Sequence, residues 1–460
     1  MRIAFKKLTG EEIYLTPIKQ NEEGLYYLLD ENSFPWIELK LENNKFNLLS
    51  RNLEIDGSRE EVQEKLDELL LKVIEQEQSG TENTETEAAP DNPYDPDSIK
   101  VQTKPFNIKL IYDMIESGDI DLNPDFQRNF VWDNLQKSRL IESVLLRIPL
   151  PMFYFSEDNE GLITVVDGLQ RLTTIKEFMD NKFALRGLEY LKDSCEGRYY
   201  SDKNKDGTPN NLNGIDPKYF RWFNMTQFTV NVIDPSSPAK VKYDIFRRIN
   251  TGGKPLNNQE IRNCLASKNL RDILNEMTQL PEFKQATDYS IKSTRMEDQE
   301  VALRFICFYR YYAEDASLNN YNGNMEITLD DATEALNKLR KDDLKVYVNL
   351  FKRAMNNAKH LFGRYAFRKI MLRHLQPGAN KQLINKALFV SWSVLLAPFE
   401  TKKIESNYST QLLAEPLANS IEYDKDLFNY LSYGTNGKAN LQKAFEAAKT
   451  IIQQNLNNNG

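Results

Sequence analysis

Apolar and polar residues alternate in short runs over the first 57 positions, and turn residues such as Thr9-Gly10 and Glu42-Asn43-Asn44 separate these runs. Alternation with a period of two is typical of half-buried strands, so the segment predicts a small antiparallel meander. Ser58 and Glu61 then have the spacing of a capping box, and a helix with one apolar face follows. We expect residues 1–75 to form a small β domain with one helix, with an accessory or a purely structural role.

Residues 76–98 have the composition of an acidic linker. The stretch 75–97 holds eight acidic residues and three prolines, and it contains no Lys or Arg. Such a segment buries too little apolar surface to offset the entropy of ordering it. We therefore predict a disordered linker here.

Residues 99–266 mix strand-like and helix-like patterns, which predicts a compact α/β unit. Beyond residue 267 the periodicity is helical almost throughout, which predicts a helical region over 267–460. The predicted fold class is therefore α+β. The helices expected in 99–266 are 108–115, 138–147, 172–179, 237–249 and one capped by Asn257 or Asn258, and the strands are 152–155, 162–166 and 228–233. The helices expected beyond it are 270–278, 297–313, 329–339, 344–361, 382–396, 424–431 and 441–456.

One stretch of the α/β unit, Val165 to Thr174, combines a strand, a tight turn and a helix. The apolar run ends on Asp167-Gly168, and Leu172, Ile175, Phe178 and Met179 then recur at helical spacing. A helix N-terminus presents unpaired N–H groups and the positive end of its dipole, so it suits an anion, above all a phosphate. The alternative is an ordinary turn whose polar residues only cap the helix.

Charge and rare residues narrow the function classes. The net charge of −8 and the pI of about 5.3 argue against a generally basic protein that coats nucleic acid. Three cysteines lie far apart, which fits a reducing cytoplasm and provides no metal or disulfide spacing. Only two histidines occur, too few for a comfortable zinc or His-Asn-His nuclease site. The chain begins without a signal peptide and has no membrane-spanning run, so we expect a cytoplasmic protein.

Three polar patches carry arginine at loops or helix ends, and one anionic ligand would explain all three. No Walker or Rossmann glycine string is present, so a nucleotide site would be of another kind. The patches are Gln127-Arg128, Asp167 to Arg171, and Arg247 to Gly253.

These motifs resemble the N-terminal domain of GmrSD-type restriction enzymes, and they occur in the order found in that family. The resemblance covers about residues 100–265, and it rests on the segments 126–132, 140–151, 167–174, 246–253 and 256–262. It implies a core similar to the ParB/sulfiredoxin fold and the binding and hydrolysis of a nucleoside triphosphate (NTP) with Mg²⁺. In such systems the NTP is coupled to the recognition or cutting of modified DNA in phage defence.

The chain departs from the family at two points. The family string Asp-Gly-Gln-Gln-Arg reads here with Leu169 in place of the first Gln, while Asp167, Gln170 and Arg171 are kept. Many full-length relatives also carry a C-terminal His-Asn-His nuclease domain, and no such domain is recognisable here. If DNA is cut, we expect it to be cut by a partner chain or by a site of a kind not recognisable in the sequence.

The residues and the resemblance together assign site roles. We predict Asp167, Gln170 and Arg171 as the catalytic set, with Asp167 coordinating Mg²⁺ or orienting the attacking water. The alternative role of Asp167 is a helix cap. Nucleotide-binding residues are predicted at three places: Gln127 and Arg128; Gly168 and Thr173; and Arg247, Arg248, Asn250, Thr251 and Gly252.

Three functions stay open from the sequence. The first is an NTP-hydrolysing component of a bacterial restriction or anti-phage system, coupled to DNA or to a partner effector chain. The second is a non-catalytic nucleotide- or DNA-binding module that recruits a separate nuclease, and the third is a standalone nuclease. A homo-oligomer is compatible with each, and DNA affinity should be weak and strongly salt-dependent because the chain is acidic.

Overall fold

The computed structural model describes residues 3–19, 24–30, 34–42, 45–79, 100–122, 132–158, 160–237, 241–243, 245, 248, 257–432 and 436–456. The chain divides into two compact units, Asn92–Leu265 and Met1–Asp91 together with Ala266–Gly460. The N-terminal sheet and the helical C-terminal region confirm the predicted α+β class. The predicted domain boundaries and the ParB-like relationship of the core stay predictions.

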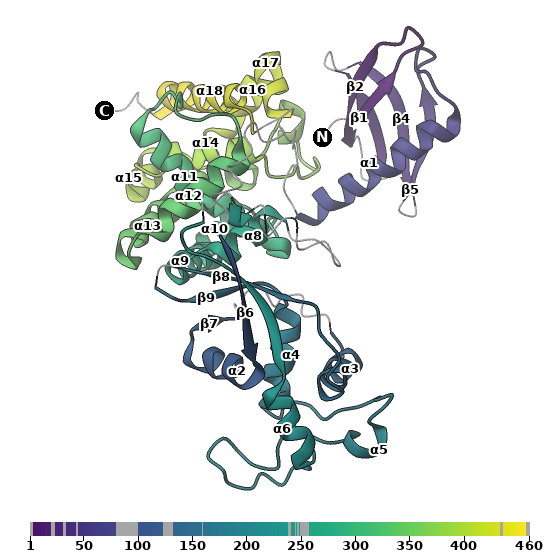
Figure 1. The fold of residues 1–460 in the computed structure, drawn as a ribbon. Helices are drawn as coiled ribbons and strands as arrows, with labels where there is room; N and C mark the ends of the chain where they lie inside the picture. The colour runs from purple at the N-terminus through teal and green to yellow at the C-terminus, as the bar shows by residue number, and fades with distance from the viewer. Residues whose placement is uncertain are drawn as a thin grey trace. The chain divides into compact units, whose positions relative to one another are not determined.

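The N-terminal segment forms the predicted antiparallel meander, and every strand pairs with its neighbour in sequence (Figure 1). Helix α1 (Arg59–Ser79) buries Val62, Leu66 and Leu69 in the same hydrophobic cluster as the sheet. The capping box forms as predicted: Ser58 N–H donates to Glu61 Oε2 at 2.7 Å, and Glu61 N–H donates to Ser58 Oγ at 3.2 Å. The strands are β1 (Ile3–Lys6), β2 (Glu12–Lys19), β3 (Leu25–Leu29), β4 (Pro35–Glu42) and β5 (Lys45–Arg51).

Helix α1 extends further than predicted. It ends at Ser79, so the first residues of the expected linker, 76–79, continue the helix. Glu and Gln are good helix formers, which explains why an acidic composition did not end the helix at residue 75. The remainder of the predicted linker lies outside the described residues.

The second unit is built on a mixed sheet in the order β6-β10-β8-β9-β7. Pairs β6–β10 and β8–β9 are antiparallel, and pairs β10–β8 and β9–β7 are parallel. The strands are β6 (Val101–Asn107), β7 (Ile120–Asp121), β8 (Phe153–Glu157), β9 (Ile163–Asp167) and β10 (Gln227–Ile233). The helices are α2 (Ile108–Ser117), α3 (Asn134–Leu145), α4 (Leu169–Met179), α5 (Lys192–Cys195), α6 (Pro217–Met225) and α8 (Asn258–Leu265).

Adjacent residues of β9 serve the two faces of this sheet. Val165 joins the large hydrophobic cluster formed with α2, α3, α4 and α6. Val166 points the other way and packs with Ile261 and Cys264 of α8. Because side chains alternate along a strand, a continuous apolar run such as 162–166 indicates a strand covered on both faces.

The C-terminal region is helical, as predicted, and its helices share one large core. The predicted helices match within a few residues, whereas three shorter helices, α10, α15 and α16, were not predicted. The helices are α9 (Lys268–Gln279), α10 (Pro281–Ala286), α11 (Glu297–Glu314), α12 (Met325–Asn337), α13 (Lys341–Phe362), α14 (Lys386–Leu396), α15 (Thr401–Asn407), α16 (Ala414–Tyr423), α17 (Lys425–Ser432) and α18 (Lys438–Leu456).

A balanced group of charges is buried within that region. Lys386 on α14 pairs with Glu297 at 2.6 Å and with Glu300 at 3.0 Å, both on α11. Arg304 pairs with Glu300 at 2.7 Å and donates to Asn436 Oδ1 at 2.8 Å. Two cations therefore match two carboxylates, which accounts for charged side chains in an otherwise apolar core.

None of the helices in the described ranges has the length and apolar composition needed to cross a membrane.

Candidate functional site

The predicted strand–turn–helix forms as expected. Strand β9 ends at Asp167, Gly168 is the N-cap residue, and α4 begins at Leu169. Gly168 has φ +99°, in the left-handed region, and no side chain caps the helix. The N–H groups of the first turn of α4 are therefore available to a ligand, together with the positive end of the helix dipole.

Gly168 is required by packing as well as by conformation. A Cβ atom at this position would lie 2.3 Å from Phe153 Cδ1 and 2.7 Å from its Cε1. Phe153 is fully buried at the start of β8, inside the main cluster of the sheet. The turn therefore sits tightly against the neighbouring strand, and only glycine fits there without movement.

Arg171 is committed to partners within the protein. Its Nη2 donates to Asp167 Oδ2 at 2.8 Å and to the Met152 carbonyl oxygen at 3.3 Å. Its Nη1 donates to the carbonyl oxygen of Pro151. The guanidinium also lies over the Phe153 ring, 4.3 Å from the centroid. Burial lowers the pKa of Arg171 and Asp167 opposes this effect. Arg171 thus joins the start of β8 to the turn after β9.

Asp167 is the more exposed member of this pair. Its side chain is 35% exposed, against 12% for Arg171. The N-cap residue of α4 is Gly168 and no side chain caps the helix, so the alternative role predicted for Asp167, a helix cap, is wrong. One carboxylate oxygen faces Arg171, and the group remains in reach of solvent.

Buried polar side-chain atoms without described partners lie in the first half of α4, which follows the turn. Gln170 Oε1, Thr173 Oγ1 and Thr174 Oγ1 are buried, and none has a hydrogen-bond partner within the described ranges. Thr173 is 5% exposed and Thr174 is fully buried. A buried polar atom without a partner costs about 1–3 kcal/mol, so this set in the first half of α4 indicates a place for a ligand or bound water.

Helix α8 carries a second set of buried polar residues, which the sequence analysis did not assign to the site. Gln259, Arg262 and Asn263 are each 1% exposed. Gln259 Nε2 and both polar atoms of the Asn263 side chain have no hydrogen-bond partner among the residues described. The signal in the sequence was the short segment Asn257 to Asn263, in which every residue except Ile261 is polar.

Asn257 caps α8, as predicted. Asn257 N–H donates to Glu260 Oε2, and Glu260 N–H donates to Asn257 Oδ1, both at 2.7 Å. This reciprocal pair is a capping box, so Glu260 fixes the start of the helix.

The structure brings together five predicted site residues at the turn: Asp167, Gly168, Gln170, Arg171 and Thr173. Arg248 is exposed, and no described contact places it in the site. The other predicted nucleotide-binding residues lie outside the described residues; they are Gln127, Arg128, Arg247, Asn250, Thr251 and Gly252.

The donor set at the turn does not fit a resident metal ion. Asp167 is the single carboxylate at the turn, and the described residues contain no cluster of three or more His, Cys, Asp or Glu side chains that could hold a metal. Mg²⁺ is commonly held by one or two carboxylates together with substrate phosphates and water. A lone carboxylate is therefore too few to hold such an ion without a substrate.

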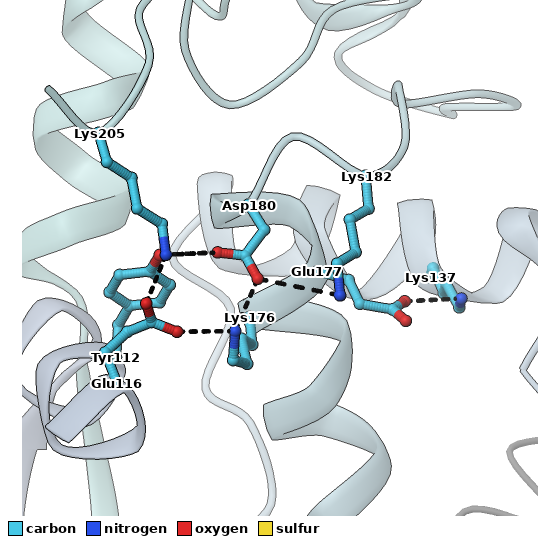
Figure 2. Close-up of polar contacts among 8 residues, drawn as sticks. All are labelled: Tyr112, Glu116, Lys137, Lys176, Glu177, Asp180, Lys182 and Lys205. Atoms are coloured by element: carbon cyan, nitrogen blue, oxygen red, sulfur yellow. Dashed lines mark hydrogen bonds and ion pairs between the residues drawn. The ribbon is translucent and has the colours of Figure 1, made fainter. Parts of the chain in front are cut away.

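Figure 2 shows a separate polar cluster at the other end of α4. Lys176 lies 2.8 Å from Glu116 of α2 and 2.7 Å from Asp180, and Lys205 lies 3.4 Å from Asp180. Burial would raise the pKa of Asp180, but hydrogen bonds from Lys176 and Tyr112 bring it below its ordinary value. These contacts fix the C-terminal end of α4 to α2 and to the loop at Lys205.

Glu142 of α3 has a structural role in the same unit. Its carboxylate is 4% exposed, and it accepts hydrogen bonds from the backbone N–H groups of Glu189, Tyr190 and Leu191 at 2.7–3.1 Å. A carboxylate among several N–H donors forms strong, charge-assisted bonds. Glu142 thus holds the loop before α5 against α3.

Glu142→Gln is therefore expected to destabilise this loop by about 1.5–3 kcal/mol, because an amide N–H₂ would face the backbone donors. Native-state hydrogen exchange of peptides within residues 132–200 measures this locally, without assuming that the whole chain unfolds in one step. Glu189→Gln is the matched control: its side chain is 52% exposed, and an effect below about 0.5 kcal/mol is expected. Equal effects of the two substitutions would contradict the assigned role.

Neither the comparison with curated proteins nor the comparison with solved structures gives a match for this chain. The comparison with protein families matches residues 108–267 to the family described as GmrSD restriction endonuclease, N-terminal domain. The match confirms the resemblance predicted from the motifs, and the matched range includes every residue of the turn. Residues 108–267 therefore form a domain of the GmrSD N-terminal family, which points to a component of a restriction or anti-phage system.

Proposed function

We propose that the chain binds a nucleoside triphosphate at the N-terminus of α4 and hydrolyses it within a restriction system. The observation that carries this proposal is the set of buried polar atoms without described partners on Gln170, Thr173 and Thr174, in the first half of a helix whose N-terminus has no capping side chain. A helix end with free N–H groups and the positive dipole favours phosphate. The match to a restriction endonuclease domain supports the part of the proposal that places the chain in a restriction system.

The phosphates would be held mainly by the backbone. The N–H groups of Leu169, Gln170 and Arg171 form the open first turn of α4, and the Thr173 hydroxyl adds a donor. Gly168 directly precedes this first turn, and it has no side chain that could block the approach of a phosphate or clash with Phe153. In this account Arg171 is a positioning residue, because described partners already occupy both ends of its guanidinium.

Gln170 is proposed to orient the attacking water. Its buried Oε1 accepts from no described residue, so it is free to accept a hydrogen bond from a water molecule beside the terminal phosphate. Asp167, held by Arg171, would polarise the same water or contact Mg²⁺ carried by the nucleotide. Bound Mg²⁺ would neutralise charge on the phosphate oxygens.

One observation favours a second candidate, a module that binds nucleotide without hydrolysing it. The carboxylate of Asp167 is already paired with Arg171 at 2.8 Å, so it is not free to take part in hydrolysis. Such a module would use nucleotide binding to recruit an effector chain or to change its contact with DNA. Hydrolysis measurements separate the two candidates.

The test is phosphate release by the purified chain with each common NTP and Mg²⁺, for wild type and Gln170→Leu. We expect turnover by wild type and a loss of about 100-fold in Gln170→Leu, the size of a lost water-orienting group. The variant should be at least as stable as wild type, because the lost amide oxygen has no described partner. Gln102→Leu, at an exposed position of β6, is the control and should keep full activity.

The outcomes are distinct. Turnover that Gln170→Leu leaves unchanged contradicts the role of this side chain, and no turnover with saturable NTP binding selects the non-catalytic module. Absence of both binding and turnover, alone or with DNA, overturns the proposal. Plasmid cutting by the chain alone would instead select the standalone nuclease.

A further inference from the structure

One face of helix α6 carries positive charge and faces solvent. The opposite face packs into the core, where the rings of Phe220 and Phe223 lie 4.9 and 5.7 Å from the Tyr200 ring. On the outer face, both cations are exposed and the methionine at the end of the helix is 77% exposed. The outer side chains recur at spacings of three and four, so they form one stripe along the helix: Lys218, Arg221, Trp222 and Met225.

Arg147, just beyond the end of α3, joins this stripe. Its guanidinium lies over the Trp222 ring, 4.2 Å from the centroid, and the Lys218 ammonium lies 4.5 Å from the same centroid. The aromatic ring thus holds two cations next to each other, and Arg221 adds a third on the neighbouring turn of the helix. We call Arg147, Lys218 and Arg221 the cation group.

Arg147 occupies a backbone position that favours glycine. Helix α3 ends in a Schellman motif, in which Arg147 N–H donates to the Val144 carbonyl oxygen at 3.0 Å and Ile148 N–H donates to that of Ser143 at 2.9 Å. Arg147 accordingly has φ +58°, in the left-handed region that disfavours a side chain. An exposed cation–π contact recovers only part of that cost, so the conformation of the backbone does not account for an arginine here.

No carboxylate balances the cation group. Its three side chains take part in no ion pair and donate no hydrogen bond within the described residues. The two segments that contain them, 143–156 and 217–233, hold no Asp or Glu. Uncompensated cations on the surface of a chain with net charge −8 indicate an anionic partner. The acidic residues that border the two segments already have partners; they are Glu142, Glu157, Asp216 and Asp234.

We propose that the cation group binds the phosphate backbone of double-stranded DNA. Contacts from Arg and Lys to phosphates provide essentially all of the sequence-independent affinity for a duplex. Proteins that hold a single strand also stack its bases on open aromatic faces. The Trp222 ring is already covered by Arg147 and Lys218, which favours a duplex over a single strand. The choice of DNA rests on the proposed place of the chain in a restriction system.

The segment that follows Arg147 leads to the proposed nucleotide site. Pro151 and Met152 supply the carbonyl oxygens that bind Arg171, and Arg171 holds Asp167. The DNA surface and the turn thus share the segment 147–152. The test therefore measures DNA binding without nucleotide, so that its result does not depend on hydrolysis at the turn.

The full chain is titrated against a short labelled DNA duplex by fluorescence anisotropy at several salt concentrations. The test variant combines Arg147→Gly, Lys218→Gln and Arg221→Gln. It should fold like wild type, because glycine suits the left-handed conformation at position 147 and the other two side chains have no described ion pair. The control variant makes the same change in net charge at three exposed lysines of the same unit outside the group: Lys100→Gln, Lys182→Gln and Lys203→Gln.

The test variant should bind the duplex at least about tenfold more weakly than wild type, and the slope of log affinity against log salt should become shallower by about 2–3, because up to three phosphate contacts are lost. The control variant should bind as wild type does. No binding of duplex by wild type, or equal losses in the two variants, would overturn the proposal. Tighter binding of a single strand, or equal binding of a polyglutamate peptide, would overturn the choice of a duplex. Phosphate release is measured separately, so a chain that binds the duplex without hydrolysing NTP contradicts only the proposed hydrolysis.

Discussion

Gly168→Ala is expected to destabilise the second unit by about 3 kcal/mol and to prevent phosphate binding at the turn. A left-handed conformation costs a residue with a Cβ about 1–2 kcal/mol. The remainder comes from the contact of 2.3 Å that the new Cβ would make with the buried Phe153 ring, since overpacking of this kind costs about 1–3 kcal/mol. Native-state hydrogen exchange of peptides from β8 and α4 measures the effect.

Gly161 offers a matched control for the backbone cost alone. It has φ +83°, and a Cβ there would meet nothing within 4 Å. Gly161→Ala should therefore cost only about 1 kcal/mol. Adding Phe153→Leu to Gly168→Ala should recover part of the difference, because the clashing ring atoms are removed. Equal effects at the two glycines would contradict the tight packing of the turn against β8.

Arg171→Ala is expected to destabilise the unit by about 3 kcal/mol and to reduce phosphate release by at least about 1,000-fold. The substitution leaves Asp167 and two backbone carbonyls without their partner, and breaking a largely buried ion pair costs about 3–5 kcal/mol before allowance for partial exposure. Activity should fall further than stability, because the turn and Asp167 both lose their fixed position, and small misplacements already cost about 100-fold. Urea titration monitored by hydrogen exchange measures the loss of stability, and a phosphate-release assay measures the loss of activity.

A second variant separates the two effects. The double change Asp167→Asn with Arg171→Met removes both charges, so part of the stability should return while activity stays absent. Arg139→Ala is the control, because Arg139 pairs with Glu189 at the surface and its side chain is 45% exposed. Recovery of phosphate release in the double variant would contradict the proposed positioning role of Arg171.

Much of this architecture was predictable because the spacing of apolar residues along the chain indicates which face of a helix or strand is buried. The apolar spacing of α11, α13 and α18 predicted long helices, and the apolar run of β9 predicted a strand, which the structure covers on both faces. Strand β6 was not predicted. It lies at the sheet edge, contains Pro105 and is mostly exposed, so it has no strong hydrophobic pattern, and its pairing with β10 spans more than a hundred residues.

The site shows the same division between local and long-range information. The turn at Gly168 and the cap at Asn257 follow from short patterns and were predicted. The sequence pattern suggested that Arg171 contacts a phosphate, whereas in the structure it binds Asp167 and backbone carbonyls 19 and 20 residues away, which no local pattern reveals.

The central claim is that the first turn of α4 holds the phosphates of an NTP. Hydrogen exchange with and without an NTP and Mg²⁺ tests this directly, because the N–H groups of Leu169, Gln170 and Arg171 have no capping side chain. The account predicts that nucleotide slows exchange in peptides that contain residues 168–172, and that Gln170→Leu retains this protection while losing hydrolysis. Saturable nucleotide binding without any slowing of exchange at these amides would contradict it.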